Sequence, residues 1–213
     1  DQIHMLGNLM IDSLVSHLEL AKSQQLSLQD ISGSSLDLSW KTEMTPYAVM
    51  TFHRPSNVDD QETLSILVDQ WLKTAELLPI IFPIHPRTLG MLEKYKLLDE
   101  LTSAPNIHLT GPLAYLDFLK LTSESALVIT DSGGIQEETT YLKIPCLTVR
   151  PSTERPITIW EGTNQLVQAK DIFENSKLSL NIPKTDYKIP KYWEGQAAQR
   201  ILTLLDDYST NKD

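Results

Sequence analysis

Residues 131–138, Asp-Ser-Gly-Gly-Ile-Gln-Glu-Glu, combine residue types and a spacing that could bind a phosphate group. Gly133 and Gly134 have no Cβ atom, so an anion could closely approach their backbone N–H groups. A helical pattern begins at Ile135, which would place these amides at a helix N-terminus, where free N–H groups and the helix dipole favour an anion. Ser132 could cap that helix or donate its hydroxyl to a phosphate. The segment therefore predicts a phosphate-binding turn, and a tight turn with an ordinary cap explains the same residues equally well.

Arginines gather just after predicted strands. The chain has five arginines, and four of them follow strand ends: Arg54, Arg87, Arg150 and Arg155. A guanidinium group offers planar, bidentate donors that suit phosphate. In a chain of net charge -10, arginines on one edge favour a small anionic ligand there. Surface ion pairs with the many carboxylates remain the alternative explanation.

Two histidines also follow predicted strands. His53 comes after the first strand and His85 after the second. A histidine in this place can act as a general acid or base, or bind phosphate when protonated, although a purely structural role explains each one singly. No spacing of histidines and carboxylates resembles a metal site, so neither a protein-bound metal nor another cofactor is expected.

The elements that must position these residues follow from the apolar pattern. Strands are expected at 47–52, 79–84, 107–110, 126–129, 145–149 and 166–168. Helices are expected at 9–18, 61–78, 89–95, 115–123, 135–142 and 196–205. This alternation predicts an α/β fold, a Rossmann-like parallel sheet with helices on both faces. Ligands bind beyond the carboxyl ends of such strands, which is where the glycines, arginines and histidines fall.

Composition narrows the function classes. The 213 residues fit one large domain or two small ones. The net charge of -10 argues against nucleic acid as a partner, because its phosphates would be repelled. No apolar run is long enough to span a membrane and no signal peptide is evident. The single cysteine, Cys146, allows no disulfide within the chain, so a reducing, cytoplasmic setting is expected. The chain opens with Asp1 and a helical pattern follows within a few residues, so a piece of a longer protein is expected.

Several motifs together resemble the non-hydrolysing UDP-N-acetylglucosamine 2-epimerases. The similarity runs along nearly the whole chain in register. The residues that carry it are His53-Arg54 with Asn57, Thr130–Glu138, Arg150 with Thr153–Pro156, Gly7-Asn8, Glu161–Asn164 and Trp193–Gly195.

The resemblance implies one half of a two-domain GT-B fold, in which a nucleotide sugar lies between two Rossmann-like halves. Residues 1–213 would form the C-terminal UDP-binding domain, with a joining helix in 1–24, a terminal helix in 190–213 and the N-terminal domain absent from this chain. The first and last helices would then expose apolar faces and favour self-association. The full-length enzyme would be a cytoplasmic homodimer that serves cell-surface polysaccharide biosynthesis.

The same resemblance implies the roles of individual residues. The diphosphate would rest on the turn Ser132-Gly133-Gly134, and the carboxylate of Glu138 would hold the ribose hydroxyls. Phe118, which the apolar pattern alone places in a helix core, would lie beside the uracil. The set carried over consists of one catalytic residue, His53, and the substrate-binding residues Arg54, Phe118, Ser132, Gly133, Gly134, Glu138 and Arg155.

The implied reaction converts UDP-GlcNAc to UDP-ManNAc by elimination and re-addition of UDP. The acid–base residues would belong to the absent half, so this chain alone is expected to bind UDP weakly and not to epimerise. The donor-binding half of a GT-B glycosyltransferase and a non-catalytic nucleotide-sugar-binding module are the alternatives. Pro55 and Ser56 replace an arginine and a glutamate usual in the family, which puts activation by a second substrate molecule in doubt. Lys143 stands where the family usually ends a helix with glycine.

Overall fold

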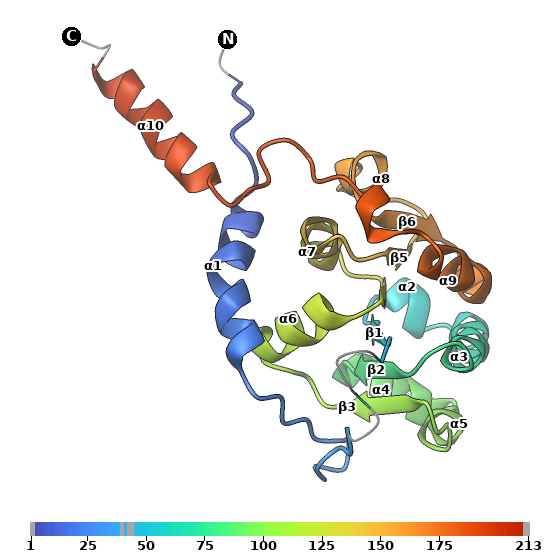
Figure 1. Ribbon diagram of the computed structural model, residues 1–213. Coiled ribbons are helices and arrows are strands. Elements are labelled where there is room, and N and C mark those ends of the chain that lie inside the picture. Colours follow the sequence, from blue (N-terminus) through green and yellow to red (C-terminus); the bar gives the residue numbers. More distant parts are fainter. Residues whose placement is uncertain (1–2, 39–40, 42–44, 211–213) are drawn as a thin grey trace.

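The computed structural model describes residues 3–38, 41 and 45–210 (Figure 1). The outermost residues of the predicted 1–213 domain, 1–2 and 211–213, lie outside this range. Six strands in the described part form one parallel sheet in the order β3-β2-β1-β4-β5-β6, which confirms the predicted fold class. The strands are β1 (Ala48–Thr51), β2 (Ile80–Pro83), β3 (Ile107–Thr110), β4 (Leu127–Thr130), β5 (Cys146–Val149) and β6 (Asn164–Val167).

The strand order reverses direction between β1 and β4. The chain steps from β1 out to β2 and β3, and then crosses back to lay β4 on the other side of β1. β1 and β4 pair along their whole length, so that Thr51 lies opposite Thr130 at their carboxyl ends. Connections leave such a pair on opposite sides, which opens a crevice for ligands at this edge of the sheet.

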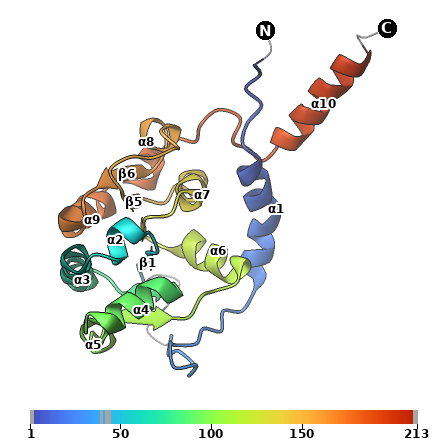
Figure 2. The ribbon, with the colours of Figure 1, turned by 180° about the vertical axis from the view of Figure 1, so that it is seen from behind.

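Helices cover both faces of the sheet (Figures 1 and 2). One face carries α6 (Tyr115–Glu124) and α7 (Gly134–Leu142), with α1 (Leu9–Ser23) packed outside them. The other face carries α3 (Gln61–Ala75), α4 (Pro86–Lys94), α5 (Leu98–Thr102) and α9 (Ile172–Leu180). Alternate strand residues serve the two faces, because successive side chains of a strand point in opposite directions. Val49 and Val128 thus pack under α6 and α7, while Met50 and Ile129 pack under α3.

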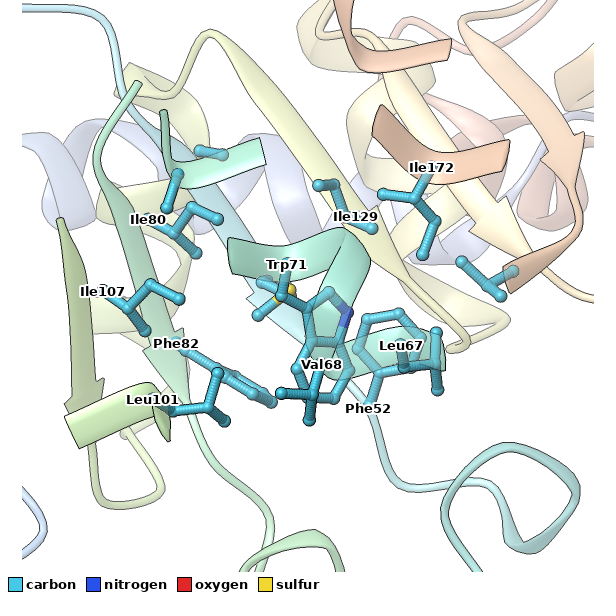
Figure 3. Close-up of a cluster of buried hydrophobic side chains, with 14 of the residues drawn as sticks. Phe52, Leu67, Val68, Trp71, Ile80, Phe82, Leu101, Ile107, Ile129 and Ile172 are labelled. Carbon is cyan, nitrogen blue, oxygen red and sulfur yellow. The ribbon is translucent and has the colours of Figure 1, made fainter. Parts of the chain in front are cut away.

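An aromatic cluster anchors α3 to the sheet. Trp71 on α3 is fully buried, and its ring centroid lies 5.0 Å from that of Phe52 and 5.3 Å from that of Phe82 (Figure 3). Truncating a buried aromatic side chain of this kind typically destabilises a domain by about 3–5 kcal/mol. This cluster gives the loops after β1 and β2, which carry His53 and His85, a rigid base.

Several short elements depart from the sequence expectations. β6 begins two residues before the predicted segment, and α9 was not predicted. The other unpredicted elements are α2 (Pro55–Val58), α5, α8 (Ile157–Trp160) and the 3-10 turns η1 (Ala169–Asp171) and η2 (Lys184–Asp186). Each is too short or too polar to produce a clear apolar period.

The first and last helices differ in how far they are covered. α1 buries Ile11, Leu14 and Ala21 on the side that faces α6 and α7. α10 (Ala197–Thr210) extends away from the sheet (Figures 1 and 2) and leaves Leu202, Leu205 and Tyr208 exposed. The expected exposed apolar residues are therefore found on α10, and on α1 they are limited to Leu9, Met10 and Leu20. None of the helices in the described part of the chain has the length and apolar character needed to cross a bilayer.

Candidate functional site

A buried carboxylate joins the loops that follow β1 and β4. Asp131 is fully buried and accepts hydrogen bonds from the backbone N–H of His53 at 3.2 Å and of Arg54 at 2.9 Å. Asn57 donates from Nδ2 to the same carboxylate at 3.1 Å. Nδ1 of His53 lies 3.1 Å from Oδ1 of Asp131. Asp131 thus fixes both the backbone and the ring of the segment that carries the predicted catalytic histidine.

The loop after β5 is tied to the same point. Asn57 donates a second hydrogen bond from Nδ2 to the carbonyl of Val149 at 3.0 Å. Nε of Arg54 donates to the main-chain carbonyl of Asp131 at 2.9 Å. The segments after β1, β4 and β5 therefore meet at one edge of the sheet, as the parallel topology predicts.

The glycine turn leads directly into α7. Gly133 occupies the N-cap position with φ -76°, and no side chain in the described part of the chain caps this helix. Of the two roles offered for Ser132, the helix cap is not found, because Gly133 is the N-cap residue. The Ser132 N–H donates to Oγ1 of Thr130 at 3.0 Å, and its carbonyl accepts from Nε2 of Gln136 at 3.0 Å. Among the described residues, no side chain therefore caps the first amides of α7.

The fold does not require glycine at positions 133 and 134. A Cβ atom added to Gly133 would meet Arg155 at 3.8 Å, an ordinary van der Waals distance, and one added to Gly134 would meet nothing within 4 Å. By contrast, a Cβ atom at Gly162 would lie 2.3 Å from the carbonyl of Thr158. The bare backbone at Gly133 and Gly134 therefore leaves space that no side chain from elsewhere in the described chain fills.

Two guanidinium groups stand beside this turn. Arg155 and Arg150 are the nearest neighbours of a Cβ atom placed at Gly133. Arg150 donates to both carboxylate oxygens of Glu154, at 2.8 and 2.6 Å, and this hydrogen bonding lowers the pKa of Glu154 to about 2. Nε of Arg155 lies 3.3 Å from Oε2 of Glu137. The turn is thus flanked by two guanidinium groups on the side that faces the β5 loop, each of them paired with a carboxylate.

The remaining strand-end arginine has another partner. Arg87 binds the carboxylate of Asp59 through Nε at 2.8 Å and Nη2 at 2.5 Å. Its backbone N–H donates to Nδ1 of His85, which caps α4. The His85 ring lies 5.7 Å from that of His53, between ring centroids. Arg54, Arg150 and Arg155 therefore lie near the glycine turn, whereas Arg87 is paired elsewhere. Ion pairing, the alternative explanation, applies to Arg87 and also to Arg150 and Arg155, which contact Glu154 and Glu137.

Glu138 is a buried carboxyl group one turn into α7. It is 7% exposed, and burial raises its pKa to about 7 despite a hydrogen bond from the Tyr115 hydroxyl. Burial and the neighbouring Glu138 raise the pKa of Tyr115 to about 12. Phe118 follows Tyr115 by one turn of α6, is partly exposed and packs against the core under that helix. Phe118 thus has a core contact, as its apolar pattern predicted, and an accessible side.

Sequence reasoning missed three side chains that organise this edge. Asp131 could have been found, because a charged residue directly after a fully apolar strand must be either solvated or hydrogen-bonded. Glu137 lies in the motif singled out in the sequence, but no role followed from its position, and Tyr115 looks like an ordinary helix-surface residue. Within the described residues, no three His, Cys, Asp or Glu side chains are grouped so as to hold a metal ion.

Comparison with known proteins gives concordant matches. The profile of a protein family, UDP-N-acetylglucosamine 2-epimerase, matches residues 1–206. The chain is 34% identical over 209 residues to the UDP-N-acetylglucosamine 2-epimerase of Methanocaldococcus jannaschii, which covers 96% of this chain and 55% of that protein. It is 37% identical over 212 residues to the enzyme of that name from Methanococcus maripaludis, with coverages of 96% and 55%.

Solved structures show the same relation. The UDP-GlcNAc 2-epimerase from Methanocaldococcus jannaschii in complex with UDP-GlcNAc and UDP matches with a TM-score of 0.76 and 32% identity, over 95% of this chain and 55% of that one. The UDP-GlcNAc 2-epimerase from Neisseria meningitidis bound to UDP-GlcNAc matches with a TM-score of 0.78 and 27% identity, over 97% and 56%. This chain spans about half the length of the curated relatives it matches.

Proposed function

Because the chain belongs to the UDP-N-acetylglucosamine 2-epimerase family, we propose that it is the UDP-binding half of an enzyme that converts UDP-GlcNAc to UDP-ManNAc. The observation that carries this proposal is the turn at Gly133 and Gly134. A Cβ atom at Gly133 or Gly134 would meet no close contact, so packing does not explain the two glycines. The turn opens a helix that no described side chain caps, and the guanidinium groups of Arg150 and Arg155 lie beside it. Free amides at a helix N-terminus together with arginines form a site that suits a diphosphate.

Three parts of the proposed site each bind one part of UDP. In the proposal, the diphosphate accepts hydrogen bonds from the turn at 132–134 and from Arg155 and Arg54. Glu138, which is buried one turn further along α7, accepts hydrogen bonds from the ribose hydroxyls. Phe118 presents its accessible side to the uracil, and its core contact holds the ring in place. The charged diphosphate, the polar ribose and the planar uracil of UDP thus each meet a matching part of the proposed site.

The proposed reaction proceeds by elimination and re-addition. A base removes the proton at C2 while the C1–O bond breaks, which releases UDP and leaves a glucal intermediate. UDP then adds back at C1 and a proton is delivered to the other face of C2. The C2 proton is barely acidic, so stabilisation of the leaving diphosphate must carry much of the barrier, and the amides and guanidinium groups at 132–134 and 155 would supply it.

His53 has a defined place in this scheme. Asp131 lies 3.1 Å from its Nδ1, so Nε2 is the ring nitrogen left for substrate. From Nε2, a protonated ring could donate to the diphosphate as charge builds up on it. The groups that move the C2 proton are assigned to the N-terminal domain, as are further contacts to the sugar. We also propose a cytoplasmic location, a homodimeric full-length enzyme and a role in cell-surface polysaccharide synthesis, which rest on family membership.

Calorimetric titration with UDP tests the binding proposal directly. We expect the 213-residue chain to bind UDP weakly, with a Kd on the order of 0.1–1 mM, and to bind GDP at least tenfold more weakly. Arg155→Ala should lower UDP affinity by tenfold or more, whereas Lys177→Ala, which removes an equal charge from an exposed ion pair on α9, should not. Equal affinity for UDP and GDP, or an unchanged Kd in Arg155→Ala, would contradict the proposed site.

Product analysis tests the reaction. Incubated with UDP-GlcNAc, the chain alone should give no UDP-ManNAc, and the full-length enzyme should give it without a sugar acceptor. Turnover by this chain alone would overturn the assignment of the acid–base groups to the other half. Transfer of GlcNAc to an acceptor would identify a glycosyltransferase half instead.

A further inference from the structure

A short line of polar contacts connects the start of α1 to the diphosphate side of the site. Nδ2 of Asn8 donates to Oε1 of Glu137 at 2.9 Å. Oε2 of the same glutamate lies 3.3 Å from Nε of Arg155. Arg155 in turn faces Gly133, at 3.8 Å from the position of an added Cβ atom. Asn8, Glu137 and Arg155 come from three separate segments, and nothing in their sequence spacing brings them together.

Asn8 is held rigidly enough to orient a neighbour. Its side-chain oxygen accepts from the N–H of Met10 at 2.9 Å as the N-cap of α1, which fixes its amide and directs Nδ2 at Glu137. The preceding Gly7 has φ +113°, and an added Cβ atom there would lie 2.5 Å from the carbonyl of Tyr192. The position of Asn8 is therefore fixed both by its own helix and by the segment that leads into α10.

Glu137 divides its two oxygens between its partners. Its side chain is only 12% exposed, and Asn8 occupies Oε1, so a single oxygen remains for Arg155. The Glu137–Arg155 contact is an ion pair without an aligned hydrogen bond among the described residues. It holds the guanidinium group at Nε and leaves the Nη side unclaimed by Glu137. Were Oε1 released, the carboxylate could take the guanidinium group in the bidentate mode that arginine and carboxylate prefer.

We propose that Asn8 is a positioning residue for diphosphate binding: it fixes Glu137, which orients the guanidinium group of Arg155 across the Ser132–Gly134 turn. Arginine loses much rotamer freedom when it is immobilised on a ligand, so holding it in place beforehand favours binding. This inference rests on the proposed function of the site. The inference adds a connection between the N-terminus of α1 and the diphosphate that the site is proposed to bind.

Asn8→Ser is the variant that isolates the link. Serine is as good an N-cap as asparagine, so α1 keeps its cap, but the side chain is too short to supply the amide that reaches Glu137. We expect UDP affinity to fall by about 5- to 20-fold in calorimetric titrations. A double-mutant cycle with Arg155→Lys, measured at UDP concentrations that saturate each variant, then separates positioning from general damage. If Asn8 acts through Arg155, Asn8→Ser should change the Kd of the Arg155→Lys protein by less than twofold.

Asp12→Asn is the matched control on the same helix. Asp12 accepts from the N–H groups of Ala197 and Ala198 at 3.0 and 2.7 Å, so this change should lower the melting temperature and leave the Kd for UDP unchanged. An equal loss of affinity on adding Asn8→Ser to the wild-type and Arg155→Lys proteins would overturn the proposal, as would no loss in either. If the wild-type chain does not bind UDP at all, the proposed function itself falls. Wild-type binding with an unaffected Asn8→Ser variant removes the positioning role alone.

Discussion

The carboxylate of Asp131 and the imidazole of His53 meet at 3.1 Å, although 78 positions separate them in the chain. The carboxylate is fully buried, whereas the imidazole is 39% exposed. One end of the contact is thus part of the core and the other faces the site. A rigid, buried acceptor that orients an accessible histidine is an arrangement suited to proton transfer or to binding a phosphate group.

Asp131→Asn should destabilise the protein strongly. The carboxylate accepts hydrogen bonds from two backbone N–H groups and from Asn57. An asparagine would replace one acceptor oxygen by an NH₂ group, which would face these donors. Leaving buried donors unsatisfied costs about 1–3 kcal/mol each, so we expect a loss of roughly 2–4 kcal/mol in the free energy of unfolding. Urea denaturation measures this loss. Asp59→Asn, at the exposed ion pair with Arg87, should have a much smaller effect, and equal losses would contradict the role assigned to Asp131.

Glu138 should make stability depend on pH. Its pKa is raised from an ordinary value of 4.5 to about 7 by burial, so the folded state binds the proton more tightly than the unfolded chain does. The associated stability is fully present below pH 4.5 and is lost as pH rises through about 7; a shift of this size corresponds to roughly 3 kcal/mol at most. Glu138→Gln should therefore match the wild type at pH 4.5 and exceed its stability at pH 8. If the stability difference between Glu138→Gln and the wild type is the same at pH 4.5 and at pH 8, the pKa of Glu138 is not raised.

UDP binding should show the opposite pH dependence. A carboxylate can accept two ribose hydroxyls, whereas a protonated carboxyl group must use one of its oxygens as a donor. The affinity for UDP should therefore rise as Glu138 ionises between pH 6 and pH 8. In that range the protein should release a proton from Glu138 when UDP binds. Calorimetry in buffers of different ionisation enthalpy measures the proton. Glu138→Gln should remove the release, and its persistence in that variant would assign the proton to another group.

Gly133→Ala should separate folding from binding. The backbone at Gly133 has φ -76° and the added methyl group meets Arg155 at 3.8 Å, so the unfolding free energy should change by less than about 1 kcal/mol. The methyl group would nonetheless occupy the space in front of the turn, and UDP affinity should fall at least tenfold. Gly162→Ala is the contrasting variant, because its methyl group would overlap the Thr158 carbonyl and should destabilise the fold. Normal UDP affinity in Gly133→Ala would show that the diphosphate lies elsewhere.

Lys143→Gly should stabilise the protein. Lys143 ends α7 in the left-handed conformation, with φ 55°, a region that glycine adopts without steric penalty. We expect a gain of about 0.5–1 kcal/mol in the free energy of unfolding, measured by urea denaturation, with no change in UDP binding. Lys143→Ala keeps the steric penalty and should show no gain. A stabilisation of equal size in both variants would point to the lysine charge instead.

The fold class could be predicted because the strands are buried on both faces. Ile107–Thr110 has the predicted bounds, and β4 and β5 lie within one residue of theirs. The shared edge of a parallel sheet then predicts that His53, Arg54 and Gly133 converge. The contacts from Asn8 to Glu137 and from Tyr115 to Glu138 could not be predicted. They depend on how α1 and α6 lie against α7, which apolar periodicity does not define.

The expectation for Ser132 failed for a local reason. A serine before two glycines and a helix has the composition of an N-cap, but the helix begins one residue later than that pattern requires. Thr130 and Gln136 take the backbone groups of Ser132 instead. The other role offered for Ser132, donation of its hydroxyl to a phosphate, stays a prediction.

The pairing of β1 with β4 has a consequence for when the candidate site forms during folding. His53, Asp131 and Arg155 are far apart in the sequence. No single continuous segment of the chain can therefore form the site before β1 and β4 pair. Closing such long loops is slow compared with helix formation. A nucleotide that binds this edge can therefore bind only chains whose sheet is already assembled. The rate at which nucleotide binding appears in a refolding sample would measure the rate of that last step.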